Sequence, residues 1–543
     1  MYKNSEIFIV LNNRVPDIDI VTHALEMLIN KLWCACFLTL FLVLKCSSLK
    51  ILAIMPHVGK SHQLVFEPLF KKLVSVGHDV TLITRFPPKI NSPHWRAIDV
   101  ATQKQNQTEL LTFDLLPGTQ LNRYTVMFLL SSMAETVCSE GLAHPNLHSF
   151  LKEDNKFDLV LLEVFNTNCF MGVAKRFDAP IIGLHSATWM PWMYQWFGMP
   201  YNTAYLPNHL LGNTDEMSFF GRVENTISHV YCNLMYRINI ASRGNALSKQ
   251  YTGVDVLDHG DLMKSISLFL INSHYSLNLP IPLVPNVIEV GGIHVDQQQA
   301  NKLPKDIDDI LKSAPHGVIY MSMGSTIQGD SFPESKKQAF FKAFSKLPQK
   351  VIWKWEGEMK NKPDNVYNVR WAPQKDILCH PNVKVFISHG GLLGVMESVY
   401  YGKPMLMLPQ FGDQFTNAAA VQKREGGVLF MLSEITEEVV TESLKKLLSA
   451  EFAGKAQLLS KTFKDRPLSP TDTALYWINY VVNNKGAPFM RTTAVDMPLY
   501  QYWLLDVLAF IGFVLLVFLY SFYRLAKYFV RKLFKKENKL KKS

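Results

Sequence analysis

The stretch between Trp371 and Asn417 constrains the fold of this 543-residue chain more than any other. Residues 383–388 form a short apolar run rich in β-branched side chains, which predicts a buried strand. His389, Gly390 and Gly391 follow at once, and a helix-like segment spans 392–401. A strand, a glycine turn and a helix start together make an anion site, because the first helix amides have no intrahelical partners and the dipole favours negative charge there. The sequence therefore predicts a parallel α/β sheet that can bind a phosphate at its edge.

Polar residues around this turn extend the predicted site. His389 can donate a further hydrogen bond to the anion, and the apolar run 405–408 delivers Asp413 and Gln414, which can hold sugar hydroxyls. The turn alone is equally well explained as a βαβ crossover closed by glycines. The wider series resembles the signature of the UDP-glycosyltransferase family, the membrane-bound animal enzymes that conjugate small lipophiles. The residues that carry the resemblance are Trp371, Pro373, Gln374, His380, Pro381, His389, Gly390, Gly391, Glu397, Gly402, Pro404, Pro409, Asp413, Gln414 and Asn417.

The resemblance runs from about Lys50 to the C-terminus and implies both a fold and an activity. The implied fold is GT-B, two facing Rossmann-like domains, with a C-terminal transmembrane helix. The implied reaction is inverting transfer of a hexose from a UDP-sugar to a small lipophilic acceptor such as a phenol, steroid or xenobiotic, without metal or other cofactor. The UDP-sugar-binding residues that the resemblance implies are Ser325, Lys354, Trp371, Ala372, Gln374, His389, Gly390, Gly391, Gly394, Glu397, Asp413 and Gln414.

The resemblance also implies roles within that set. Trp371 would stack on uracil, Gln374 would bind the base or ribose, and Glu397 would bind the ribose diol. Ser325 would contact the donor phosphate, although a turn or cap also explains it, and Lys354 would add a cation nearby. Many relatives carry Ser where this chain has Gly394, which keeps a backbone amide but loses a hydroxyl.

The first half of the chain supplies the expected catalytic pair. Two strands, 50–55 and 80–84, flank a helix over 64–76 and predict a parallel sheet, with ligands at the carboxyl ends of its strands. His62 lies in the loop 56–63, and the resemblance makes it the catalytic base; His57 in the same loop is the alternative. Glu163 follows the strand 157–162 and would orient the base, whereas Asp158 lies at the opposite end of that strand. The family commonly has Asp in place of Glu163.

Two features bear on the substrates. Vertebrate glucuronosyltransferases carry Arg between two prolines just before the passage between the halves (286–294), but this chain has Ile281 there. Ile281 cannot pair with a carboxylate, which favours a neutral hexose, most simply glucose, over UDP-glucuronate. The segment 181–206 is rich in aromatic residues and Met, which suits a lipophilic acceptor but equally suits ordinary core.

Other functional classes receive less support. A catalytically silent, membrane-anchored binder of lipophiles or UDP-sugars is motivated by Glu163, Ile281 and Gly394. A dinucleotide-dependent oxidoreductase would need GxGxxG after the first strand, which is missing. Asp306 and Asp308 resemble a metal-binding DxD, but they follow Pro304 at an expected helix start, where acidic residues favour the dipole.

The domain boundaries follow from these patterns. We expect an upstream extension (1–26), a signal peptide (27–48), an acceptor-binding domain (49–288) and a UDP-sugar-binding domain (289–485). A juxtamembrane segment (486–502), a transmembrane helix (503–523) and a basic cytoplasmic tail (524–543) complete the chain. Nine basic residues against Glu537 alone lie after Tyr523, so the +10 net charge is local and gives no support for a nucleic-acid partner.

The topology that follows is single-pass type I in the endoplasmic reticulum membrane, with both domains lumenal. Lys539 and Lys541 resemble a dilysine retrieval signal, although an ordinary basic tail also explains them. Asn106 begins a glycosylation sequon. The four cysteines outside the signal region are too few and too scattered for a disulfide framework or a CxxC metal site. A homo- or heterodimer is compatible with the sequence.

Overall fold

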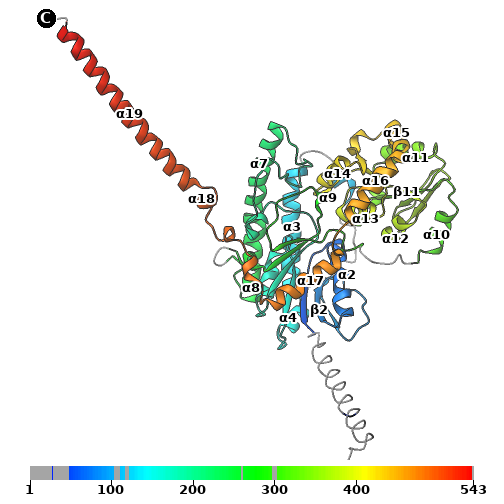
Figure 1. The fold of residues 1–543 in the computed structure, drawn as a ribbon. Coiled ribbons are helices and arrows are strands. Elements are labelled where there is room, and N and C mark those ends of the chain that lie inside the picture. The colour runs from blue at the N-terminus through cyan, green and yellow to red at the C-terminus, as the bar shows by residue number, and fades with distance from the viewer. Residues whose placement is uncertain are drawn as a thin grey trace, which may run out of the picture. The chain divides into compact units, whose positions relative to one another are not determined.

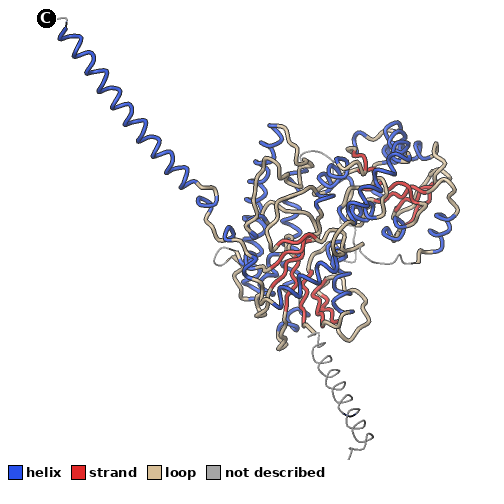
Figure 2. The backbone as a smooth tube through the Cα atoms, viewed as in Figure 1, coloured by secondary structure: helices blue, strands red, loops and turns tan. Residues whose placement is uncertain are grey.

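The computed structural model describes residue 27 and residues 48–102, 111–115, 122–257, 261–295 and 302–540. Of the expected signal peptide (27–48), only the first and last residues are among those described. Asn106 lies outside the described residues. The chain divides at Leu49, and the unit from Lys50 onward holds two parallel sheets. Figure 1 shows the course of the chain, and Figure 2 shows the strands of both sheets.

The first sheet has seven parallel strands in the order β3-β2-β1-β4-β5-β6-β7. Its apolar strands are buried on both faces, as a sheet covered by crossover helices requires. The strands are β1 (Lys50–Met55), β2 (Asp79–Thr84), β3 (Trp95–Asp99), β4 (Leu159–Glu163), β5 (Ile181–His185), β6 (Leu268–Ile271) and β7 (Val287–Glu289). The α-helices are α2 (Lys60–Ser75), α3 (Asn122–Leu142), α4 (Pro145–Leu151), α5 (Met171–Ala174), α6 (Tyr194–Phe197), α7 (Phe219–Met235), α8 (Ser242–Thr252) and α9 (Tyr275–Asn278).

The second sheet has six parallel strands in the order β10-β9-β8-β11-β12-β13. The strands are β8 (Val318–Ser322), β9 (Lys350–Lys354), β10 (Val366–Val369), β11 (Val383–Ser388), β12 (Met405–Met407) and β13 (Gly427–Leu429). The helices are α10 (Lys305–Lys312), α11 (Glu334–Phe344), α12 (Gln374–Cys379), α13 (Leu392–Tyr400), α14 (Gln414–Lys423), α15 (Glu437–Leu447), α16 (Ala450–Lys464) and α17 (Pro470–Asn483). Asp306 and Asp308 lie in the first turn of α10, where the sequence placed a helix start.

Two segments connect the halves in both directions. Leu111 forms a parallel bridge with Ile327, and Phe113 packs in the hydrophobic core of the second half, with its ring 5.0 Å from that of Phe332. In return, α17 packs against α2, and Lys72 Nζ lies 3.3 Å from Asp472 Oδ1. Helix α17 of the second half therefore lies against helix α2 of the first.

The apolar C-terminal segment forms one long helix, α19 (Leu505–Leu540), after the short α18 (Leu499–Tyr502). Leu505–Phe534 is long and apolar enough to cross a membrane. The sequence placed this span at 503–523, but the helix continues through the basic tail because Lys, Arg and Leu are good helix formers.

One disulfide joins Cys138 in α3 to Cys169, in the short helix Asn168–Phe170. The sequence provided no support for a disulfide framework and left open which cysteines pair. Cysteines 31 residues apart meet here because α3 packs beside the segment that follows β4.

Candidate active site

His62 and Glu163 lie together at the carboxyl edge of the first sheet. His62 is in the first turn of α2, and its Nδ1 is 2.8 Å from Oε1 of Glu163, the last residue of β4. The contact arises because β1 and β4 are neighbours, so the loop after β1 passes the end of β4. The Glu163 side chain is fully buried, whereas that of His62 is 17% exposed. Nδ1 therefore faces the carboxylate, which leaves Nε2 to meet a ligand.

Burial sets the protonation of this pair. Desolvation raises the pKa of Glu163 to about 7 and lowers the pKa of His62 to about 3. The imidazole is therefore neutral near pH 7, and a carboxylate at Nδ1 holds the tautomer whose Nε2 carries no proton. Such an arrangement can accept a proton from a hydroxyl and stabilise the imidazolium that forms.

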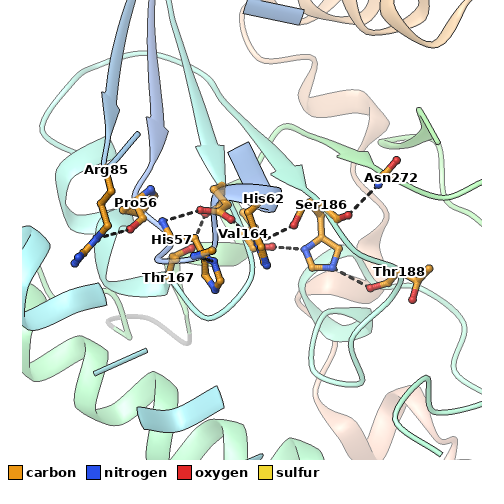
Figure 3. A network of polar contacts seen from close by, with 12 residues as sticks. Pro56, His57, His62, Arg85, Val164, Thr167, Ser186, Thr188 and Asn272 are labelled. Carbon is orange, nitrogen blue, oxygen red and sulfur yellow. Dashed lines mark hydrogen bonds and ion pairs between the residues drawn. The ribbon is translucent and has the colours of Figure 1, made fainter. Parts of the chain in front are cut away.

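His57, the alternative base, is buried against His62 and helps to hold it in place. The two rings stack with centroids 3.6 Å apart, and His57 is only 3% exposed. Its Nδ1 accepts a hydrogen bond from the Gly59 amide at 2.9 Å, and its own amide donates to Glu163 Oε2 at 3.2 Å. Figure 3 shows the two histidines side by side. His57 thus positions the ring and the carboxylate but presents no accessible edge to a substrate.

These three side chains could also ligate a metal. Among the described residues, His57, His62 and Glu163 are the one group of such side chains that brings three ligand atoms within 4.8 Å of one another. The Gly59 amide and Glu163 already engage the two Nδ1 atoms, so a metal would have to replace these hydrogen bonds or use the other ring nitrogens. Our expectation that the chain needs no metal stays a prediction.

Ser186 also lies in this site, although the sequence did not predict it there. Its Oγ lies 2.8 Å from the same Nδ1 of His62, and the residue is 4% exposed. Asn272 holds the Ser186 carbonyl at 2.9 Å, and His185 Nε2 lies 2.9 Å from the Thr188 carbonyl (Figure 3). Ser186 directly follows β5, which pairs with β4. The signal that placed Glu163, a polar residue just after a buried strand, would have found Ser186 too.

The glycine turn of the second half encloses the His389 ring. A Cβ at Gly324 or Gly391 would lie 2.6 or 2.5 Å from atoms of this ring, so only glycine permits its position. Gly390 has φ +82°, and its amide donates to Ser388 Oγ at 2.9 Å. The N-cap of α13 is Gly391, and no side chain caps the helix there, which leaves the capping position to a bound anion. Burial lowers the pKa of His389 to about 4, which makes it a neutral hydrogen-bond donor.

Gln374 and Glu397 form a second polar pair in this half. Gln374 Nε2 donates to Glu397 Oε2 at 2.7 Å, and burial raises the pKa of Glu397 to about 7. A Cβ at Gly394 would lie 3.0 Å from the same Gln374 nitrogen, so the missing serine gives this pair room. His294, from the passage between the halves, lies 3.9 Å from Glu397 Oε1 and was not expected here.

The remaining predicted donor residues lie around these pairs. Trp371 is 61% exposed and lies next to the buried Ala372. Lys354 Nζ is 5.8 Å from the centre of the Trp371 ring, and it pairs with Glu356 and donates to the Gly324 carbonyl at 3.1 Å. Its charge is therefore shared with a carboxylate rather than committed to an anion. Ser325 is half-buried in the turn after Gly324.

Asp413 and Gln414 are more engaged within the protein than the sequence suggested. Gln414 Oε1 accepts from the Gln410 and Phe411 amides at 2.8 and 3.2 Å, so a sugar would meet its amide nitrogen. Asp413 Oδ2 accepts from Asn417 Nδ2 at 2.9 Å, and burial raises the pKa of Asp413. Asn417 also donates to the Gly390 carbonyl at 3.2 Å, which links the pair to the glycine turn.

A pocket lies between the two halves. Its walls come from the segment after Ser186, from residues 278–281 before β7 and from helix α14. The residues that line it include Thr188, Trp189, Tyr194, Tyr205, His209, Asp215, Ile281, Glu289, Thr416 and Asn417. The aromatic segment serves both as pocket wall and as core: Trp189, Tyr194 and Tyr205 line this pocket, whereas Trp192, Trp196 and Phe197 are at most 4% exposed and lie in the first hydrophobic core.

Comparison with known proteins agrees with this architecture. A family profile described as UDP-glucoronosyl and UDP-glucosyl transferase matches residues 54–540. The chain is 39% identical over 475 residues to UDP-glycosyltransferase UGT5 of Dactylopius coccus, covering 86% of this chain and 90% of that protein. It is 30% identical over 513 residues to human UDP-glucuronosyltransferase 1A10, covering 91% of this chain and 94% of that protein.

Solved structures show the same fold. Spinosyn forosaminyltransferase SpnP aligns with a TM-score of 0.54 at 18% identity, over 80% of this chain and all of that one. The glycotransferase of kitacinnamycin aligns with a TM-score of 0.52 at 18% identity, over 80% of this chain and 98% of its own. The fold is GT-B, and with the family profile matched over nearly the whole described unit, the chain belongs to the UDP-glucoronosyl and UDP-glucosyl transferase family of enzymes.

Proposed function

We propose that the chain transfers a hexose, most simply glucose, from a UDP-sugar to a hydroxyl of a small lipophilic acceptor, with inversion at the anomeric carbon. The observation that carries this proposal is the His62–Glu163 pair, with its contact of 2.8 Å and one accessible imidazole edge. His62 Nε2 takes the hydroxyl proton while the oxygen attacks the anomeric carbon and the bond to UDP breaks. Glu163 stabilises the imidazolium through Nδ1.

The second half would hold the departing nucleotide. Trp371 stacks on the base, Gln374 and Glu397 bind the base and ribose, and Ser325 and the first amides of α13 bind the diphosphate. His389 donates a hydrogen bond to the charge that develops on UDP, and Lys354 adds positive potential. Asp413 and Gln414 bind the sugar.

The pocket residues support a neutral sugar. Ile281 lines the pocket at the place where a carboxylate-binding Arg would be expected. The charged residues among the described lining are Asp215 and Glu289, both acidic, and Asp215 pairs with Lys423 at 2.6 Å. A glucuronate carboxylate would meet these acids, whereas a glucose hydroxyl can donate to them.

Location follows from α19 and the basic tail. We propose a single-pass type I protein of the endoplasmic reticulum membrane, with both sheets lumenal, the apolar part of α19 up to Tyr523 as its span and the basic residues from Arg524 onward on the cytoplasmic side.

Radiolabelled UDP-glucose and UDP-glucuronate, each offered with phenols and steroids to membranes that contain the full chain, test the proposal. We expect an acceptor glucoside of inverted configuration, at a rate that a chelator does not change, and little glucuronide. Preferential glucuronide formation would overturn the donor assignment. Tight UDP-glucose binding without any product would favour the catalytically silent binder instead.

A further inference from the structure

Helix α7 exposes apolar side chains and buries polar ones, which is the reverse of an ordinary surface helix. The large apolar side chains on one of its faces recur every three or four residues and continue into the π-helical turn Tyr236–Ala241. We call this set the α7 stripe: Phe219 (63% exposed), Phe220 (78%), Val223 (40%), Ile227 (58%), Val230 (66%), Leu234 (55%) and Ile238 (55%).

The opposite face of α7 is polar and buried. Asn225, Ser228 and His229 are at most 1% exposed. Asn225 Nδ2 donates to the Thr203 and Leu206 carbonyls at 2.7 and 2.8 Å, and Ser228 Oγ accepts from Asn208 at 2.7 Å. These bonds fix which face points inward, so the apolar stripe cannot turn toward the core. A stripe of this size left in water is costly, which argues that a nonaqueous partner covers it.

The segment that leads into α19 contacts the same region of the first half. Tyr502, in α18, donates from Oη to the Met199 carbonyl at 3.1 Å, and Gly198 lies against Thr492 and Val495. The preceding α6 packs on the inner face of α7, where the Tyr194 and His229 ring centroids are 6.4 Å apart. Trp192 stacks on Tyr236 with a centroid distance of 4.7 Å. This aromatic layer thus contacts α7 on one side and adjoins the segment that leads into α19.

Charges along the stripe suit a lipid surface. Arg222 and Arg237 are exposed, and the Arg222 guanidinium lies 5.9 Å from the centre of the Phe219 ring. Arginines of this kind can keep their charge at the headgroups while their stems and neighbouring rings enter the acyl region.

We propose that the α7 stripe lies in the surface of the bilayer that α19 enters, as a second membrane contact that does not span. This proposal rests on the proposed anchoring by α19. A membrane-lying α7 would hold the first sheet at the lipid surface, where lipophilic acceptors concentrate.

Photocrosslinking of the full chain in phosphatidylcholine–phosphatidylethanolamine nanodiscs tests the proposal. A diazirine amino acid replaces Phe220 or Val230, and in a matched control it replaces Leu458, the one large apolar side chain of α16 that is exposed (65%). We expect a phospholipid adduct at positions 220 and 230, about tenfold more abundant than at position 458. A crosslink between two copies of the chain would assign the stripe to a dimer and overturn the proposal, as would adducts with water alone.

A second measurement separates this contact from the anchor. The full chain, with a protease site inserted after Met497, is reconstituted into vesicles of the same lipids and then cleaved. The body should stay with the vesicles, whereas a body with Phe219→Asp, Phe220→Asp and Val230→Asp should be released. Leu458→Asp should not cause release. Equal release of the unmodified body would contradict the proposal, and sugar transfer by that body, assayed in parallel, tests the proposed function separately.

Discussion

At the scale of single residues, the protonation of Glu163 should control turnover. Burial raises its pKa to about 7, so the carboxylate is mostly ionised above pH 7 and mostly protonated below it. Only the ionised form stabilises an imidazolium at His62. We therefore expect kcat at saturating donor to fall as the pH drops through about 7. Saturation matters because Glu397 titrates in the same range and would change donor binding.

The variant Glu163→Gln isolates this effect. It keeps a polar group at Nδ1 without charge, so we expect kcat to fall about 10²- to 10⁴-fold and the acid limb of the pH profile to disappear. Asp158→Asn is the matched control, because Asp158 precedes the same strand and accepts the Lys50 amide at 2.8 Å. An acid limb that persists in Glu163→Gln would assign the titration to another group.

The place of Ser186 beside His62 could not be predicted from its neighbours in the sequence alone. The local rule, a polar residue after a buried strand, applies equally to Glu163 and Ser186. Only strand order shows that β4 and β5 are neighbours and that both residues reach His62. His294 was missed for the same reason, since 103 positions of chain separate it from Glu397 while their side chains lie 3.9 Å apart.

At the scale of elements, the segment 111–115 connects the first half to the loop that follows β8 in the second half and contains Ser325. The Leu111 amide donates to the Thr326 carbonyl at 3.1 Å, and the Phe113 amide donates to Ser331 Oγ at 3.0 Å. Phe113→Ala should destabilise the fold by about 3–5 kcal/mol, because it leaves a cavity in the second core. It should also weaken UDP binding, since Ser325 precedes the bridged residues.

Thermal unfolding and UDP titration measure both effects. Phe489→Ala, at a ring that is 66% exposed, is the control and should change neither. A Phe113→Ala protein with lower stability but unchanged UDP affinity would show that the segment supports only the core.

The disulfide is a second element-scale feature. Cys138–Cys169 closes a loop of 31 residues between α3 and the segment after β4. Cys138→Ser should lower the free energy of unfolding by about 3–4 kcal/mol, mainly by freeing the unfolded chain. Cys379→Ser, which removes a free thiol, should have a much smaller effect in the same denaturation assay. Equal effects would mean that the bridge adds no constraint.

At the scale of the whole molecule, local patterns predicted the sheets well. The expected strands 383–388 and 50–55 are β11 and β1, and the expected helix 392–401 is α13 with one residue fewer. These segments combine apolar runs with glycine punctuation, so neighbours along the chain decide their structure. The disulfide, the Leu111 bridge and the outward face of α7 depend on contacts between distant segments, which hydropathy patterns do not contain.

We propose that His62 acts as the base for transfer from a UDP-sugar held by the second half. The measurement that tests it most directly compares the turnover of His62→Ala with its UDP-glucose affinity, both in the full membrane-bound chain. We predict that turnover falls at least ~10²-fold while the dissociation constant for UDP-glucose stays within about twofold. Turnover that remains at the level of the unmodified chain would show that His62 is not the base.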